Sequence, residues 1–230
     1  MTAPSRPADE RPVGLLTRGA DPKKRFLPLL FALILPAYLL FFFWVERTVP
    51  LTGYWPSYLP IDDQIPFLEG FIVFYYLWYV MLGSVGFYLL FFDGEGFSRY
   101  MIFVGVSFGL AMAFCLFFPN GQDLRPDLAS LGRDNVFIRL IAAIYRADTN
   151  TNVLPSVHVI GVFAVFFGVI ENGALKRKKW PVALTAVCGT LVSLSTVFVK
   201  QHSLLDVILA IPYSLLLYLL LYKILFRKRK

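Results

Sequence analysis

The sequence has little charge and almost no cysteine or histidine. Only 16% of its 230 residues are charged, whereas 57% are hydrophobic, a balance that soluble domains of this length rarely show. The two cysteines, Cys115 and Cys188, fall in apolar segments without metal-ligand spacing, so they favour packing over a disulfide framework. The sequence also lacks an internal repeat, a Gly-rich phosphate loop and an N-glycosylation sequon. The scarcity of charge beside so much hydrophobic sequence points to a membrane protein.

Six long apolar segments occupy most of the chain. A helix needs about 20 apolar residues to cross about 30 Å of hydrocarbon, and runs of this length are too long for barrel strands. The sequence therefore predicts an all-α fold, a six-transmembrane-helix bundle. The segments are 26–45, 70–92, 100–122, 153–170, 180–199 and 203–226.

The chain divides into one membrane domain and two short tails. Residues 1–25 are rich in proline and charge, which predicts a disordered cytoplasmic tail. The first apolar run is full length and shows no small-residue cleavage site, so it is expected to remain as a span. The predicted membrane domain covers 26–226, and 227–230 form a basic cytoplasmic tail.

The basic residues predict which side of the membrane each loop faces. With both termini in the cytoplasm, 16 of the 22 Lys and Arg residues lie on that side, as the positive-inside rule expects. The clusters at 176–179 and 227–230 are expected to anchor helices against anionic lipid; no folded basic domain suggests nucleic acid as a partner. Short loops and the compact chain favour a bacterial cytoplasmic membrane. The charge asymmetry implies that the polar residues described next, a candidate active site, face outward. Nothing in the sequence indicates an oligomeric state.

The only two histidines, His158 and His202, both fall at the predicted outer ends of spans. His202 and Asp206 are four residues apart, so a helix places them on one face. A carboxylate that accepts a hydrogen bond from Nδ1–H leaves the Nε2 lone pair free and stabilises positive charge on the ring. Such a histidine can act as a nucleophile or a strong base.

A second group of polar residues is expected beside this pair. Ser156 and His158 lie at a predicted helix start, where free N–H groups favour phosphate oxygens, and His158 could protonate a leaving oxygen. Arg125 and Lys200 supply positive charge for phosphate binding. The set fits phosphoryl transfer through a phosphohistidine. It does not suit zinc, because two histidines and one aspartate already paired leave too few ligands, and no cofactor is expected.

An alternative is that these groups are satisfied hydrogen bonds between helices, since a His-x-x-x-Asp pair alone is a weak signal. The convergence of both histidines, the serine and the cations on one side favours a functional site instead.

These motifs resemble those of the type-2 phosphatidic acid phosphatase superfamily, which includes the vanadium haloperoxidases. The resemblance implies that His202 attacks phosphorus, Asp206 orients it, and His158 protonates the leaving group without a metal. The acceptor activated by His158 would then be water in a phosphatase or a lipid alcohol in a transferase, and the substrate a lipid phosphate or phospholipid. The matching positions are Arg125-Pro126, Pro155-Ser156-Val157-His158, and Ser195, His202 and Asp206 at the family's spacing.

The sequence departs from the family pattern at two cations. The first-motif lysine falls at Phe118 and the third-motif arginine at Thr196, and Lys200 could replace one of them. In this respect the chain looks more like inositol phosphorylceramide and sphingomyelin synthases. Because a dianionic monoester needs more positive charge than a diester, the departures favour a diester substrate. A non-catalytic lipid-binding or transport protein stays an alternative, and a proton-coupled carrier is a weaker one.

Two outer segments carry further expectations. An apolar stripe within 133–148 predicts an interfacial helix capped by Asp134, either gating the site or simply packed on the bundle. Asp62 and Asp63 are expected to be solvated loop charges.

Overall fold

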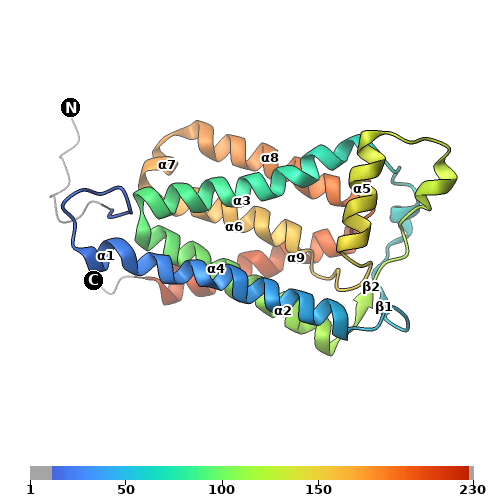
Figure 1. Ribbon diagram of the computed structural model, residues 1–230, viewed down its shortest axis with the longest axis horizontal. Helices are drawn as coiled ribbons and strands as arrows, with labels where there is room; N and C mark the ends of the chain where they lie inside the picture. Colours follow the sequence, from blue (N-terminus) through green and yellow to red (C-terminus); the bar gives the residue numbers. More distant parts are fainter. Residues whose placement is uncertain (1–11, 228–230) are drawn as a thin grey trace.

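The computed structural model describes residues 12–227, and within them the protein is a bundle of helices with two very short strands (Figure 1). The α-helices are α1 (Pro22–Phe26), α2 (Ile34–Thr48), α3 (Ile72–Phe92), α4 (Gly94–Phe117), α5 (Val136–Ala147), α6 (Val157–Glu171), α7 (Gly173–Arg177), α8 (Lys179–Phe198) and α9 (Leu204–Tyr218). Short 3-10 segments cover Leu27–Leu33, Pro60–Asp63, Glu69–Phe71 and Leu128–Leu131, and a π-helical segment, Leu219–Leu225, continues α9.

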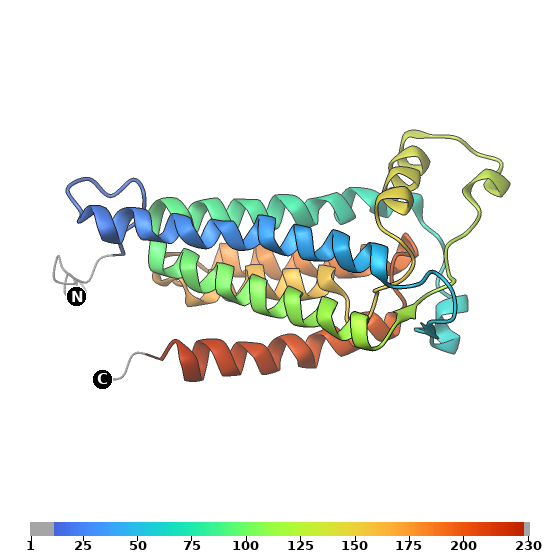
Figure 2. The ribbon, with the colours of Figure 1, turned by 60° about the horizontal axis from the view of Figure 1, so that its bottom comes forward.

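Helix α6 is the centre of the bundle, and α3, α4, α8 and α9 pack around it. Its sequence is apolar on all sides, as expected of a helix with no face to solvent. Ile160 and Phe167 of α6 contribute to the main core together with Trp78, Phe103 and Val192 from the surrounding helices. Helix α2 lies along α4 at the edge of the bundle (Figures 1 and 2).

The all-α fold expected from the sequence is confirmed, and five helices are long and apolar enough to cross a membrane. These five cover Pro22–Thr48, Glu69–Phe92, Gly94–Phe117, Lys179–Phe198 and Leu204–Leu225. The remaining predicted span corresponds to α6, which has 15 residues and is therefore only about 22 Å long. The protein is a multi-pass membrane protein, while the count of six spans stays a prediction.

The two ends of the bundle differ in structure. Helix α5, strands β1 (Trp55–Pro56) and β2 (Asn120–Gly121) and their loops gather at one end, called here the site end (Figures 1 and 2). The strands pair in parallel and hold the loop after α2 against the chain that follows α4. Helices α1 and α7 lie at the opposite end, as does the end of the last helix (Figure 1). Orientation in the membrane stays a prediction from charge.

Residues 12–25 differ from the disordered tail expected of them. The backbone N–H groups of Leu15 and Leu16 donate to the carbonyls of Leu90 and Phe91, at 3.1 Å each. These carbonyls belong to the last turn of α3, where a helix has no further N–H groups of its own to satisfy them. The segment thus completes the end of α3. Residues 1–11 lie outside the described residues, and of the predicted basic tail only Arg227 lies within them.

Close packing of α6 on α3 requires a glycine. A Cβ atom at Gly161 would lie 2.4 Å from Trp78 Nε1, closer than real Cβ contacts allow. We predict that Gly161→Ala lowers the free energy of unfolding by about 1–3 kcal/mol, because the helices must separate. Gly109→Ala is the matched control, since nothing lies within 4 Å of its Cβ position in α4. Thermal unfolding in detergent compares the two; equal effects would contradict this packing argument.

Candidate active site

The starts of α6 and α9 place the predicted catalytic residues together at the site end. Helix α9 begins with a capping box: the Ser203 hydroxyl accepts from the N–H of Asp206 at 3.3 Å, and the Asp206 carboxylate accepts from the N–H of Ser203 at 2.9 Å. This reciprocal cap turns the Asp206 side chain back toward His202, the residue before the N-cap. The backbone N–H of Ser156, the N-cap of α6, donates to the Asp206 carbonyl at 3.2 Å.

Asp206 contacts His202 in the predicted manner. Its Oδ2 atom lies 3.1 Å from His202 Nδ1, and its other oxygen accepts from the hydroxyl of Ser57. The carboxylate is fully buried, so these donors and Ser203 N–H replace the water it loses. A proton on His202 Nδ1 then leaves Nε2 with a lone pair. The predicted proximity of His202 and Asp206 is confirmed, while their catalytic roles stay a prediction.

His158 lies against the free side of His202. Its Nδ1 atom is 3.2 Å from His202 Nε2, and the rings are inclined at 65°. The rings of Tyr75 and Trp78 pack on His158, with centroids 4.5 and 4.7 Å from its own. Both imidazoles are buried. With the Nε2 lone pair of His202 as acceptor, His158 Nδ1–H is the donor, so the two rings form one proton-sharing pair.

This geometry unites the second and third motifs seen in the sequence. A family model described as PAP2 superfamily matches residues 100–230, which is more than half of the chain and includes every predicted site residue. The chain belongs to the PAP2 superfamily. Membership indicates a membrane phosphatase-type activity on a phosphate ester. No curated protein and no solved structure matches the chain.

Arg125 is the one cation of the first PAP2 motif that this sequence retains. Its guanidinium donates to backbone carbonyls and does not point freely at the histidines. It donates to the carbonyls of Asp148 and Thr149 at 3.1 and 2.7 Å and to the side chain of Gln201. Its guanidinium also stacks on Tyr145, 4.4 Å from the ring centroid. These contacts fasten the end of α5 to the residue beside His202. Its predicted role in phosphate binding stays a prediction.

The side chain of Lys200 also donates a hydrogen bond to a backbone carbonyl. Its buried ammonium group donates to the backbone oxygen of Asp62 at 2.9 Å, and burial lowers the pKa of Lys200. Asp62 itself is fully buried and accepts from the N–H groups of Leu59 and Leu204, at 2.8 and 2.9 Å. The expectation of a solvated Asp62 was therefore wrong, because its carboxylate caps the first turn of α9. Asp63 is exposed and accepts from the Tyr58 hydroxyl.

The two positions that depart from the family pattern have other partners. Thr196 is fully buried, and its hydroxyl donates to the Ser193 carbonyl at 2.8 Å. Its own carbonyl accepts from the N–H groups of Gln201 and His202, so Thr196 shapes the turn that carries His202. Phe118 is 39% exposed and packs against Trp55. Neither residue supplies a charge.

Acidic groups accompany the histidines at the site end. Glu46, at the end of α2, accepts from Thr149 and from the side chain of Asn152. The neighbouring Asp148 is half-buried and interacts electrostatically with Glu46, Arg125 and His202. Burial, reinforced by Glu46, raises the pKa of Asp148 to about 6. Negative charge near the histidines disfavours a second negative charge on a bound phosphate.

Several of these residues escaped sequence reasoning. Ser57 and Asp148 lie in loops whose sequence carries no spacing rule, so only the fold brings them near His202. Gln201 adjoins His202 in the sequence, but its contact with Arg125 depends on the fold. Ser203 did have a signal, because a serine three residues before an aspartate is a capping-box pattern. The interfacial helix expected within 133–148 is α5, but its N-cap is Asn135 and not Asp134, which pairs with Arg139 instead.

Within residues 12–227, no three or more His, Cys, Asp or Glu side chains are grouped so as to hold a metal ion. Cys115 is buried, as expected of a packing residue.

Asp148 generates a prediction about pH. Because its pKa is raised from 3.8 to about 6, its charged form destabilises the folded state above pH 6, and this effect disappears as the pH falls toward 4. We predict that Asp148→Asn is more stable than the wild type at pH 7, by at most about 3 kcal/mol. The advantage shrinks between pH 6 and 4 in thermal unfolding of the purified proteins. A constant difference over this range would contradict the raised pKa.

Proposed function

We propose that this PAP2 protein is a membrane enzyme that acts on lipid phosphate esters through a phosphohistidine on His202, without a metal. The observation that carries the proposal is the hydrogen-bonded series Ser57–Asp206–His202–His158. It holds one imidazole with a carboxylate on Nδ1 and a second imidazole at Nε2. A nucleophile with an orienting carboxylate and an adjacent acid/base is the arrangement that covalent catalysis requires.

The reaction runs in two steps. His202 Nε2 forms a bond to phosphorus as the bond from phosphorus to the leaving oxygen breaks, and His158, which enters this step as the imidazolium, gives that oxygen a proton and becomes neutral. Asp206 stabilises the positive charge that develops on His202. His158 then accepts a proton from water or from a lipid alcohol, whose oxygen attacks phosphorus and breaks the N–P bond. Both histidines end the cycle in their starting states.

The site is closed in the conformation described. His202 Nε2, the atom that must reach phosphorus, is 3.2 Å from His158 Nδ1, and both rings are buried. A phosphorus atom can approach Nε2 only after the two rings separate. Substrate binding in this proposal therefore replaces the contact between the two histidines with contacts to the phosphate.

Head-group transfer from a phosphodiester is the second candidate, and the charges at the site end favour it. Arg125 and Lys200 donate to backbone carbonyls, while Glu46 and Asp148 add negative charge. A phosphodiester carries one negative charge, so it needs less compensation than a monoester does. The acceptor would then be a lipid alcohol, as in the sphingomyelin and inositol phosphorylceramide synthases that the sequence resembles.

The nucleophile can be tested by substitution. We predict that His202→Ala lowers turnover at least ~10³-fold, because no other group can form the covalent intermediate. The protein should still fold, since Ser57 and Ser203 continue to donate to Asp206. Steady-state rates and size-exclusion elution in detergent measure both. Wild-type rates in a folded variant would overturn the mechanism.

The products distinguish the candidate functions. Purified protein is given phosphatidic acid, polyprenyl pyrophosphate, or phospholipid with ceramide or diacylglycerol, each with and without EDTA. Free phosphate indicates a phosphatase, and a new phospholipid without free phosphate indicates a transferase. Specific lipid binding without either product would favour a non-catalytic lipid protein. We expect EDTA to leave the rate unchanged; a strict need for Mg²⁺ would contradict a metal-free site.

A further inference from the structure

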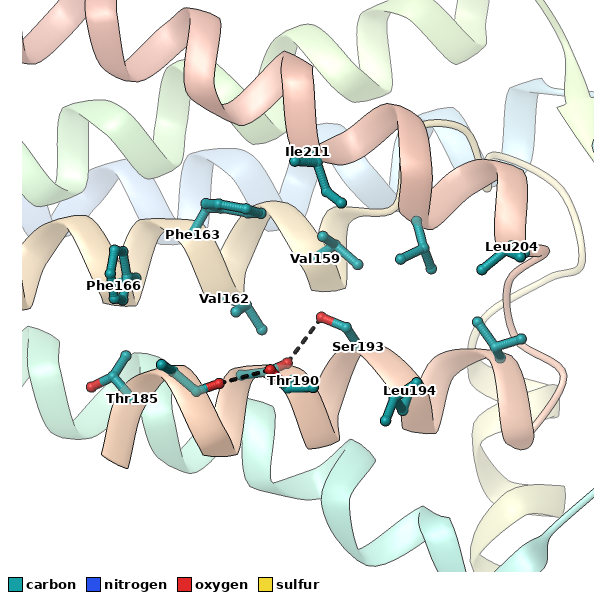
Figure 3. Close-up of a pocket in the computed structure, with 14 residues that line it drawn as sticks. Val159, Val162, Phe163, Phe166, Thr185, Thr190, Ser193, Leu194, Leu204 and Ile211 are labelled. Atoms are coloured by element: carbon teal, nitrogen blue, oxygen red, sulfur yellow. Dashed lines mark hydrogen bonds between the residues drawn. The ribbon is translucent and has the colours of Figure 1, made fainter. Parts of the chain in front are cut away.

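An apolar groove lies between α8 and α9, with α6 as its floor (Figure 3). Its volume is ≈ 370 Å³. Helices α8 and α9 both pack on α6 but make few contacts with each other, which leaves this space between them. The floor includes Val159 and Phe163, the α8 wall includes Thr190 and Ser193, and the α9 wall includes Leu204 and Val207.

The walls of the groove present hydrocarbon even where they carry hydroxyl groups. Thr190 and Ser193 each donate to a carbonyl of their own helix at 2.9 Å (Figure 3). Thr185 does so at 2.7 Å. These hydroxyls therefore have their donor satisfied without a ligand. A water molecule needs two to four polar partners to occupy a cavity stably, and apolar spaces favour apolar occupants. The chemistry of the walls thus selects a hydrocarbon chain.

One end of the groove is lined by close sequence neighbours of the proposed catalytic residues. Val159 follows His158 on α6, and Leu204 and Val207 flank Asp206 on α9. From Val197 the α8 wall continues to Thr185, about 18 Å away along the helix. A molecule with its polar end at His202 and an apolar chain behind it has the shape that this arrangement fits.

We propose that this groove holds an acyl chain of the lipid whose phosphate reaches His202. At about 30 Å³ for a group the size of water, its volume suits on the order of a dozen methylene groups. Leu194 lines the groove and is also 44% exposed on the outside of the bundle, so the chain can enter sideways from the membrane. The identity of the chain as part of a substrate rests on the proposed function.

Ser193→Phe fills the groove and provides the first test. Val187→Phe is the matched control, because Val187 lies on the same helix, is 60% exposed and does not line the groove. Thr190→Phe is a second filling variant in case Ser193→Phe fails to fold. The probe is phosphatidic acid with a diazirine midway along one acyl chain. It is present at trace level in phosphatidylglycerol vesicles that contain the complete 230-residue protein. Mass spectrometry then locates the label after illumination.

We expect residues of the groove to be labelled several-fold more than lipid-facing Leu184, which is 54% exposed, in the wild type and in Val187→Phe. In either filling variant the groove label should fall to the Leu184 level. Equal labelling of groove and Leu184 in the wild type would overturn the proposal, as would groove labelling unchanged by Ser193→Phe and Thr190→Phe.

Kinetics separate this proposal from the proposed function. For one substrate class with acyl chains of increasing length, we expect the ratio of long-chain to short-chain kcat/KM to fall at least ~10-fold in Ser193→Phe and to be unaffected by Val187→Phe. If all variants turn over the substrate with the same dependence on chain length, the proposed role of the groove is refuted while the proposed enzymatic function still stands. Specific groove labelling in a protein that turns over no phosphate ester would support the groove and refute the proposed function.

Discussion

The site end depends on the hydrogen bonds that satisfy the buried carboxylate of Asp206. An unpaired charge in this position would cost several kcal/mol, so the fold must bring donors to it. Those donors come from separate parts of the chain: Ser57 from the loop after α2, His202 from the turn after α8, and Ser203 from the cap of α9. The groups that satisfy the carboxylate are therefore also the groups that orient the proposed nucleophile.

In the structure, the two cations predicted to bind phosphate make contacts within the protein. Arg125 joins the end of α5 to Gln201, and Lys200 joins the turn before His202 to the loop containing Asp62. These cations hold the loops in place around the histidines. In the closed conformation, the positive charge available to a phosphate therefore has to come from the histidines themselves or from rearrangement of these contacts. This shortage of free positive charge is consistent with the proposed phosphodiester substrate, which carries a single negative charge.

Much of the fold was accessible from the sequence because lipid imposes a simple rule. Long uncharged runs must be helices, and five of the predicted spans are long apolar helices. The pairing of His202 with Asp206 was likewise accessible from their four-residue spacing, although His202 precedes α9 and it is the capping box, not a helical turn, that brings the two side chains together. Ser57 and Asp62 were not accessible, because nothing in a loop's sequence reveals which helix end it will cover. The expectation for 12–25 failed for a similar reason: composition indicated disorder, whereas the last turn of α3 offers unpaired carbonyls.

The central claim is that His202 becomes covalently phosphorylated through Nε2. The most direct measurement is to mix the protein with a turned-over lipid substrate, quench in alkali within milliseconds to seconds, and locate phosphate on peptides by mass spectrometry. The account predicts a phosphate on Nε2 of His202, absent from the His202→Ala variant. Phosphate on His158, or turnover with no phosphorylated histidine at any time point, would contradict it.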